Sequence, residues 1–401
     1  MKILMLSWEY PPRIVGGIAR VVYNLAQKLG EQGHEVHVVT CREKNAVEEK
    51  NAVEEELDSN VYVHRINVYD INANNFIDWV FQMNFSLLES SIKLLNKING
   101  VDVIHAHDWL TAFAAKVLKH SYQIPLVATI HATEAGRNNG IHNEIQKYIS
   151  SVEWWLTYEA WRVIVNSKYM QSEVKKLFCL PEDKIRMVPN GVNLNKFDSY
   201  SKDKEFRNKY AMNDEKIIFF VGRIVNEKGV HILIDAIPKI LNYYNNIKVV
   251  IAGKGPKLEY LQEKAKAMNI AHKIYFTGYI SEDELGKLYK CADIGVFPSV
   301  YEPFGIVALE GMVANVPVIV SDTGGLGEIV EHDVDGLKFY TGNSNSLADC
   351  ILEILNNPEK SESIKNKAFE KVKRMYNWDI IAEQTYQVYM EIVKKEKNDK
   401  R

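Results

Sequence analysis

Short runs of apolar residues alternate along the chain with longer stretches in which apolar positions recur every three or four residues. The short runs predict buried strands, and the longer stretches predict amphipathic helices. Strands separated by helices are typical of βαβ units and of parallel sheets. The strands predicted in the first half are Lys2–Leu6, Glu35–Thr40, Val61–Ile66, Val101–His105, Leu126–Ile130 and Arg162–Val165. Those predicted in the second half are Ile217–Val221, Lys248–Ala252, Ile274–Thr277, Ile294–Pro298 and Val318–Val320.

This pattern predicts an α/β protein. Because one open sheet seldom holds as many strands as are predicted here, we expect two sheets in two domains. Residues 188–192 read Val-Pro-Asn-Gly-Val, which is typical of a turn, and a polar, charged stretch follows them. We therefore expect an N-terminal domain over residues 1–192 and a C-terminal domain over residues 193–377. A last helical pattern begins at Trp378.

Composition narrows the class of protein. The 401 residues are 46% hydrophobic and 25% charged, which is ordinary for a globular protein with a large core. A formal net charge of −3 creates no field that would attract nucleic acid, so we expect no nucleic-acid partner. The four cysteines form no C-x-x-C pair, which argues against a zinc site and a disulfide framework. We find no transmembrane segment or signal peptide and expect a cytoplasmic protein. No pattern indicates an oligomeric state.

Two glycines, Gly16 and Gly17, stand between the first predicted strand and a helical pattern. They would let the backbone approach a ligand closely, and a helix N-terminus offers unpaired N–H groups to an anion. A turn that merely needs a positive φ is the alternative. The chain contains neither G-x-G-x-x-G nor G-x-x-x-x-G-K-[ST], so a dinucleotide fingerprint and a P-loop are both excluded.

Two cations, Arg223 and Lys228, lie five residues apart on the loop that follows the predicted strand Ile217–Val221. Sheets of α/β proteins bind ligands at the carboxyl ends of parallel strands. A guanidinium fork and an ammonium point charge are together suited to a diphosphate. The alternative is that both are solvated surface cations.

Two carboxylates, Glu302 and Glu310, flank a predicted strand-to-helix junction. At a rise of about 1.5 Å per residue they would lie at most about 12 Å apart. That is too far for the acid and nucleophile of a retaining glycosidase, which need about 5 Å. The spacing suits two groups that bind different hydroxyls of a long ligand such as a nucleotide sugar. The alternatives are a capping role for Glu302 and a solvated helix face for Glu310.

In combination these motifs resemble those of a known family. Glu302-Pro-Phe-Gly-(four residues)-Glu310 resembles the E-x7-E motif of retaining glycosyltransferases of the family 4 type, which have the GT-B fold. Residues 221–229 resemble their diphosphate-binding strand end, Gly16-Gly17 their glycine loop, and 188–192 the segment before the interdomain crossing. The resemblance covers essentially the whole chain. It implies two Rossmann-like, doubly wound domains facing a cleft, with a helix at about 378–401 crossing back to the first domain.

Within that family, residues 105–112 and 131–137 resemble the glycogen and starch synthase branch. This implies a hexosyltransferase of glycogen biosynthesis that moves glucose from ADP-glucose or UDP-glucose to the non-reducing end of an α-1,4-glucan. It implies no cofactor and no metal ion. Ile14 stands where larger bacterial starch synthases carry lysine, which puts an ADP-glucose donor in doubt. The alternatives are sucrose-type, trehalose-type or lipid-linked acceptors, or a nucleotide-sugar-binding protein without catalysis.

The resemblance also implies roles for single residues, in which His131 contacts the donor sugar and Glu310 the ribose. The catalytic set would be His131, Arg223, Lys228 and Glu302. The acceptor-binding pair would be Asp108 and Trp109. The donor-binding set would be Gly16, Gly17, Phe304, Gly305, Ile306, Val307 and Glu310. Without a second close carboxylate, transfer would proceed by front-face attack, and stabilising the departing diphosphate would be the main catalytic task.

Three further sequence patterns are interpreted as structural features and are not assigned to a functional site. Asp333-Val-Asp335 contains a D-x-D, the metal-binding signature of another transferase fold, but its context predicts a turn. Trp154, Tyr158 and Trp161 form an aromatic stripe at helical spacing. We interpret the stripe as core packing, with sugar stacking as the alternative. A six-residue repeat over 45–56 is interpreted as a loop expansion.

Overall fold

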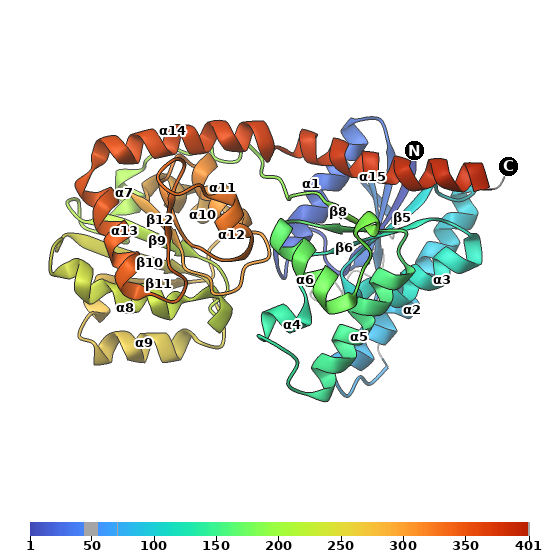
Figure 1. The fold of residues 1–401 in the computed structure, drawn as a ribbon, viewed down its shortest axis with the longest axis horizontal. Helices are drawn as coiled ribbons and strands as arrows, with labels where there is room; N and C mark the ends of the chain where they lie inside the picture. Colours follow the sequence, from blue (N-terminus) through green and yellow to red (C-terminus); the bar gives the residue numbers. More distant parts are fainter. Residues whose placement is uncertain (44–54, 70, 400–401) are drawn as a thin grey trace. The chain divides into compact units, whose positions relative to one another are not determined.

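The computed structural model describes residues 1–43, 55–69 and 71–399, and the chain forms two compact units (Figure 1). Unit 1 comprises Met1–Asn190 together with Trp378–Arg401, and unit 2 comprises Gly191–Asn377. The first division thus falls between Asn190 and Gly191, whereas the sequence analysis placed it after Val192. Residues 45–54 of the predicted loop expansion lie outside the described residues.

The sheet of unit 1 has eight strands in the order β3-β4-β2-β1-β5-β6-β7-β8. All neighbours pair in parallel except β3, which runs antiparallel to β4. After β1 the chain builds one side of the sheet and then the other, so the switch point lies between β1 and β5. The strands are β1 (Lys2–Leu6), β2 (Glu35–Cys41), β3 (Glu55–Asp58), β4 (Val61–Ile66), β5 (Val103–His107), β6 (Leu126–Ile130), β7 (Arg162–Val165) and β8 (Ile185–Met187).

Helices cover both faces of this sheet (Figure 1). Leu4 and Leu6 lie in one core with α2, α3, α5 and α6, while Ile3 and Met5, equally buried, point to the opposite face because side chains alternate along a strand. The helices are α1 (Gly17–Glu31), α2 (Phe76–Ile98), α3 (Ala112–Tyr122), α4 (Glu134–Arg137), α5 (Glu144–Glu159), α6 (Lys168–Phe178) and α15 (Trp378–Asp399). Two short 3₁₀ turns are η2 (Trp109–Thr111) and η3 (Glu182–Lys184).

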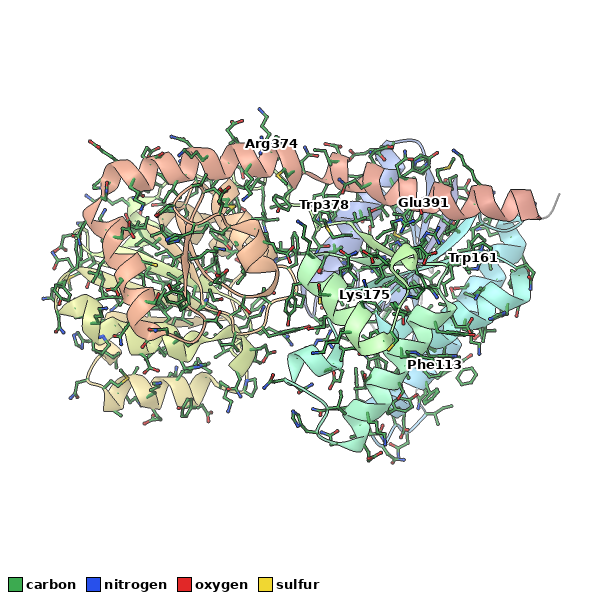
Figure 2. All side chains as sticks on the ribbon, viewed as in Figure 1. Phe113, Trp161, Lys175, Arg374, Trp378 and Glu391 are labelled. Carbon is green, nitrogen blue, oxygen red and sulfur yellow. The ribbon has the colours of Figure 1, made fainter. Side chains whose placement is uncertain are left out.

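Helix α15 is bonded to three strands of unit 1. Glu391, labelled in Figure 2, accepts hydrogen bonds from Arg162 of β7 at 2.9 Å and from Arg186 of β8 at 2.7 Å. Tyr389 Oη lies 2.7 Å from Nδ1 of His105 in β5, and both side chains are fully buried. These polar contacts fix the register of the helix against the strands, and Ile392 adds apolar burial.

The sheet of unit 2 has six parallel strands in the order β11-β10-β9-β12-β13-β14. Ile217 and Phe219 enter one core and Ile218 and Phe220 the other. Helices therefore cover both faces, which explains the continuous apolar run of β9. The order reverses between β9 and β12, which is the switch point of this unit. The strands are β9 (Lys216–Val221), β10 (Ile247–Ala252), β11 (Ile274–Gly278), β12 (Ile294–Phe297), β13 (Val318–Ser321) and β14 (Leu337–Phe339).

The helices of unit 2 divide between the two cores. Those with buried residues in the core that holds Phe219 include α10, α11, α12 and α14, and those in the core that holds Phe220 include α8, α9 and α13. The helices are α7 (Lys204–Arg207), α8 (Val230–Leu241), α9 (Leu258–Ala267), α10 (Glu282–Cys291), α11 (Ile306–Val313), α12 (Gly324–Ile329), α13 (Ser344–Asn356) and α14 (Pro358–Met375). Two 3₁₀ turns are η4 (Asn226–Lys228) and η5 (Ala271–Lys273).

The predicted strands are all present, with ends that match or shift by one or two residues. The largest shift is at β5, which runs over Val103–His107 and so carries His107 on the strand itself. Three strands were not predicted: β3, β8 and β14. Each is short and lies at or next to the end of its strand order, where one-sided burial weakens the apolar pattern.

Two residues of the predicted aromatic stripe, Trp154 and Tyr158, lie on α5 and do not enter the core, so the core-packing prediction was wrong for them; Trp161 lies beyond the end of α5 and is half-buried. Trp154 and Tyr158 are 45% and 63% exposed, and their rings stack with centroids 5.6 Å apart. The helix instead buries Ile149, Val152 and Leu156, which recur at the same helical spacing. Tyr148 and Trp155 of the same helix also pack against this core while remaining partly exposed.

In the part of the chain that the structure describes, no helix combines the length and the hydropathy needed to cross a membrane.

Candidate active site

In unit 2, the loops after β9 and β12 bring Lys228 and Glu302 together. The Nζ atom of Lys228 lies 2.6 Å from Oε2 of Glu302, and Ser299 Oγ donates to the same oxygen at 3.1 Å. Glu302 is only 8% exposed. Its carboxylate accepts no backbone N–H among the described contacts, so it does not act as a cap. Both loops leave the carboxyl ends of the two strands at the switch point, where α/β sheets bind ligands.

A glycine allows these loops to touch. Gly229 has φ +65, and a Cβ there would lie 1.8 Å from the carbonyl oxygen of Pro298. The amide of Val300 also donates to the carbonyl of Glu227 at 2.8 Å. Any larger residue at position 229 would therefore push the Lys228 loop away from the Glu302 loop.

Two helix N-termini adjoin Glu302. Helix α11 follows Gly305, which has φ +111, and no side chain caps it. Its first residues, Ile306 and Val307, carry N–H groups without a partner in the helix, which makes this end attractive to an anion. The amide of Gly325 in α12 donates to the carbonyl of Glu302 at 2.8 Å. Phe304 is buried beneath this junction and is 5% exposed.

Glu310 lies one turn into α11 and is 3% exposed, so it is not on a solvated face. Its Oε1 forms a 2.5 Å ion pair with Nζ of Lys196, and Tyr289 Oη donates to its Oε2 at 3.4 Å. Lys196 comes from the charged segment before β9, to which the sequence analysis gave no role. The carboxylate of Glu310 thus has a cation beside it that no local motif indicated.

Arg223 differs from Lys228 although both follow β9. Its side chain is 61% exposed, and its guanidinium lies 3.5 Å from Glu227. The structure therefore brings Lys228, and not Arg223, to Glu302. A long, exposed guanidinium at this strand end keeps the freedom to rotate toward a bound anion.

In unit 1, β5 and β6 are neighbours, and their ends bring Asp108 to His131. Asp108 Oδ1 accepts a hydrogen bond from the backbone amide of His131 at 2.8 Å, and Arg137 Nη2 lies 3.7 Å from Oδ2. Asp108 and His131 are 2% and 8% exposed. Asp108 has φ +59, a conformation that costs a non-glycine residue on the order of 1 kcal/mol or more. Such strain concentrates at functional sites.

His107 adjoins His131, and the His105 ring lies against that of His107. His107 Nδ1 lies 3.1 Å from His131 Nε2, and His105 Nε2 lies 2.7 Å from Thr129 Oγ1. Burial lowers the pKa of His107 and His131, and it lowers the pKa of His105 to about 3, so all three rings are neutral at pH 7. Both lie in the segment 105–112 that resembles the glycogen and starch synthase branch, but neither was predicted to take part in the site. Their period-two spacing on one strand was the available signal.

Trp109, the residue after Asp108, is the first residue of η2 and is 4% exposed. Its ring belongs to the core of unit 1 and meets Phe76 edge-to-face, with centroids 6.2 Å apart. Little of the ring is therefore open for stacking on a sugar, and its burial holds the neighbouring Asp108 in place.

The glycine loop after β1 contains an internal carboxylate. Glu9 is completely buried, and its Oε2 accepts hydrogen bonds from the amides of Val15 at 2.6 Å and Gly16 at 2.8 Å. Burial raises the pKa of Glu9, while these bonds oppose the rise. Gly16 has φ −152 and no positive φ is found at Gly17, so the alternative of a positive-φ turn was wrong. An external anion would bind other amides of this loop.

The predicted turn at Asp333-Val-Asp335 is confirmed. Asp335 Oδ2 lies 2.7 Å from Lys371 Nζ, and its Oδ1 accepts from the amide of Glu331 at 2.8 Å. Both oxygens of the Asp335 carboxylate therefore have partners within the protein. Over residues 1–43, 55–69 and 71–399, no three His, Cys, Asp or Glu side chains gather in a way that could hold a metal ion.

Comparison with known proteins identifies the class. Residues 15–196 match the model of Glycosyltransferase Family 4, and residues 201–371 match that of Glycosyl transferases group 1. An uncharacterized glycosyltransferase of Methanocaldococcus jannaschii is 42% identical over 393 residues, covering 97% of this chain and 98% of that protein. The chain therefore belongs to the glycosyltransferase family that these two models describe. It is also 31% identical over 402 residues to the glycogen synthase of Mycobacterium tuberculosis, covering 97% of this chain and 94% of the relative.

Solved structures show the same fold. Sucrose-phosphate synthase from Thermosynechococcus elongatus has a TM-score of 0.81 at 23% identity, with 98% of each chain covered. The catalytic domain of starch synthase IV from Arabidopsis thaliana, bound to ADP and acarbose, has a TM-score of 0.73 at 17% identity, covering 98% of this chain and 99% of that one. Anabaena HepE in complex with UDP and glucose has a TM-score of 0.75 at 20% identity, covering 97% and 99%. The predicted GT-B fold is confirmed.

Proposed function

We propose that this glycosyltransferase moves glucose from ADP-glucose or UDP-glucose to the non-reducing end of an α-1,4-glucan, with retention at the anomeric carbon. The observation that carries the proposal is the contact of Lys228 with Glu302 at the switch point of unit 2. It pairs a cation suited to a diphosphate with a carboxylate suited to sugar hydroxyls. The relationship to a glycogen synthase supports the glucan, and the neighbours bound to ADP or UDP support the donor.

The reaction breaks the bond between the anomeric carbon and the diphosphate and forms one to a hydroxyl oxygen of the glucan. The acceptor proton passes to the departing phosphate oxygen. Negative charge therefore grows on the diphosphate, and Lys228, Arg223 and the amides at the start of α11 would stabilise it. These groups supply the positive charge that the step requires, so the proposal includes no metal ion and no cofactor.

The remaining residues would bind the rest of the substrates. Glu310, with Lys196 beside it, would hold the ribose hydroxyls, and Glu302 the glucose hydroxyls. In unit 1, neutral His131 would bond a sugar hydroxyl, and Asp108 would order the acceptor side. Trp109 would act by holding Asp108 in place.

The test is release of nucleoside diphosphate from ADP-glucose and from UDP-glucose, each with and without glycogen or a maltooligosaccharide. We expect release that depends on the glucan, together with lengthening of the oligosaccharide. The Glu302→Gln variant serves as the inactive control, because it keeps the size of the side chain and removes its charge. Release that does not depend on glucan, or none with either donor, would reject the glucan synthase and leave the family assignment intact.

A further inference from the structure

A continuous series of buried polar rings leads from α15 to His131. Tyr389 Oη contacts Nδ1 of His105 at 2.7 Å, and the His105 ring lies against that of His107 with centroids 4.1 Å apart. His107 then contacts His131, and these two rings are stacked at an interplanar angle of 18°. His105 and His107 are fully buried, so water does not compete for these contacts.

The bond between His107 and His131 permits only two arrangements of protons. Nδ1 of His107 and Nε2 of His131 lie 3.1 Å apart, and in two neutral rings one nitrogen donates while the other accepts. If His131 donated, the proton of His107 would have to lie on its Nε2. If His107 donates from Nδ1, its Nε2 carries a lone pair, and the proton of His131 lies on Nδ1.

The surroundings of His107 Nε2 favour the second arrangement. This atom is buried and has no hydrogen-bond partner among the described residues. A buried N–H without an acceptor is the rarer defect in folded proteins, because it forfeits the whole desolvation cost of a donor. A lone pair at this position avoids that defect. His107 therefore donates to His131.

We infer that His107 is a positioning residue, which holds the His131 ring in one orientation and keeps its proton on Nδ1. His131 remains 8% exposed, and its Nδ1 has no partner within the described part of the chain. It thus presents a fixed N–H donor that fits the oxygen of a sugar hydroxyl. This last step rests on the proposed function, whereas the tautomer of His131 does not.

The tautomer can be measured directly by ¹⁵N NMR of the full-length protein with labelled histidine, without substrate. The ring ¹⁵N shifts separate a protonated nitrogen from one with a lone pair, and the His131→Gln variant assigns the His131 signals. We expect Nδ1–H for His131 in the wild-type protein. In His107→Phe, which keeps a flat ring without nitrogen, we expect loss of that single state. In His107→Asn, whose amide places a donor near the position of Nδ1, we expect the state to be retained.

A matched control comes from the same strand. His105 is as buried as His107 but does not bond to His131, so His105→Phe should lower stability and leave the His131 tautomer unchanged. Nε2–H on His131 in the wild-type protein, or an unchanged Nδ1–H in His107→Phe, would overturn the inference.

Turnover provides the second readout. We expect His107→Phe to lower kcat by about tenfold or more, since small misplacements of substrate-positioning groups reach losses of this size, and His107→Asn to recover most of it. Equal losses in both variants would show a merely structural role and would also overturn the inference. If the wild-type protein transferred nothing to glucan, the proposed function would fail while the NMR result still decided the tautomer.

Discussion

Lys228 donates from Nζ to Oε2 of Glu302 across 2.6 Å, and this contact joins two motifs that are far apart in the sequence. Each residue neutralises the other while no ligand is bound. A diphosphate would draw the ammonium toward itself and leave the carboxylate to the sugar hydroxyls. Removing either partner would leave the other charge largely buried and unpaired, which is costly.

Replacing Lys228 with alanine should lower kcat by about 10²–10³-fold, the scale of one lost preorganised donor, and change KM much less. The measurement is steady-state release of nucleoside diphosphate. Lys239→Ala is the matched control, because this lysine is also ion-paired, to Asp349 at 2.6 Å, but lies in α8 away from the strand ends. Near-normal turnover in Lys228→Ala would contradict the proposed role.

The pair of Lys196 with Glu310 predicts a stability effect. Lys196→Met would leave the carboxylate of Glu310 buried without its cation, and we expect a loss of roughly 2 kcal/mol in the free energy of unfolding. Lys196→Met/Glu310→Gln should recover part of that loss, because it removes both charges. Urea denaturation of the two single variants and the double variant measures the coupling. Additive losses would show that the pair contributes nothing to stability.

Gly229→Ala should separate the loops that carry Lys228 and Glu302. The new Cβ would meet the Pro298 carbonyl at 1.8 Å as well as adopt a positive φ. Gly342 also has a positive φ, +81, but nothing lies within 4 Å of its Cβ position. Gly342→Ala should therefore cost only the conformational strain, about 1–2 kcal/mol, and keep turnover. Gly229→Ala should lose more stability and most of its activity, and equal effects in the two variants would refute the steric argument.

Stability should fall in mild acid because of His64. Burial, with a further contribution from His37, lowers the pKa of His64 to about 4, so the folded state resists protonation of this ring. The unfolded chain binds the proton near its ordinary pKa of about 6.5. The contribution of His64 is therefore fully present above that pH and is lost as pH falls toward 4, by up to about 3 kcal/mol. Chemical denaturation at several pH values should show a weaker acid dependence for His64→Gln, and an identical one would contradict the assignment.

The sequence was informative wherever a pattern is local. The strands β9 and β12 were recognised by their apolar runs, and Lys228 and Glu302 were placed after them by position alone, whereas the strand order and the switch points came only from the structure. The edge strand β14 was not predicted because its three residues, of which Leu337 and Phe339 are buried, give too short a pattern. Pairings between distant residues, such as Lys196 with Glu310, were not predictable, because no spacing rule links side chains 114 positions apart.

The aromatic stripe of α5 shows a different limit. Two stripes recur at the same helical spacing, and periodicity does not say which of them turns toward the sheet. In the structure Val152 and Leu156 are buried, and Trp154 and Tyr158 are in contact with solvent. The contacts of the helix with the rest of the unit decide such cases, and only the assembled fold supplies them.

The carboxylate of Glu9 behaves as a tethered pseudo-ligand of its own glycine loop. It accepts hydrogen bonds from the amides of Val15 and Gly16, so these N–H groups already have an acceptor before any ligand arrives. The loop is consequently ordered by the protein itself, and the entropy of ordering it is lost during folding. An inhibitor that binds the amides of Val15 and Gly16 would have to displace the Glu9 carboxylate from them. Because Glu9 is part of the same chain, its effective concentration at these amides exceeds that of a free ligand.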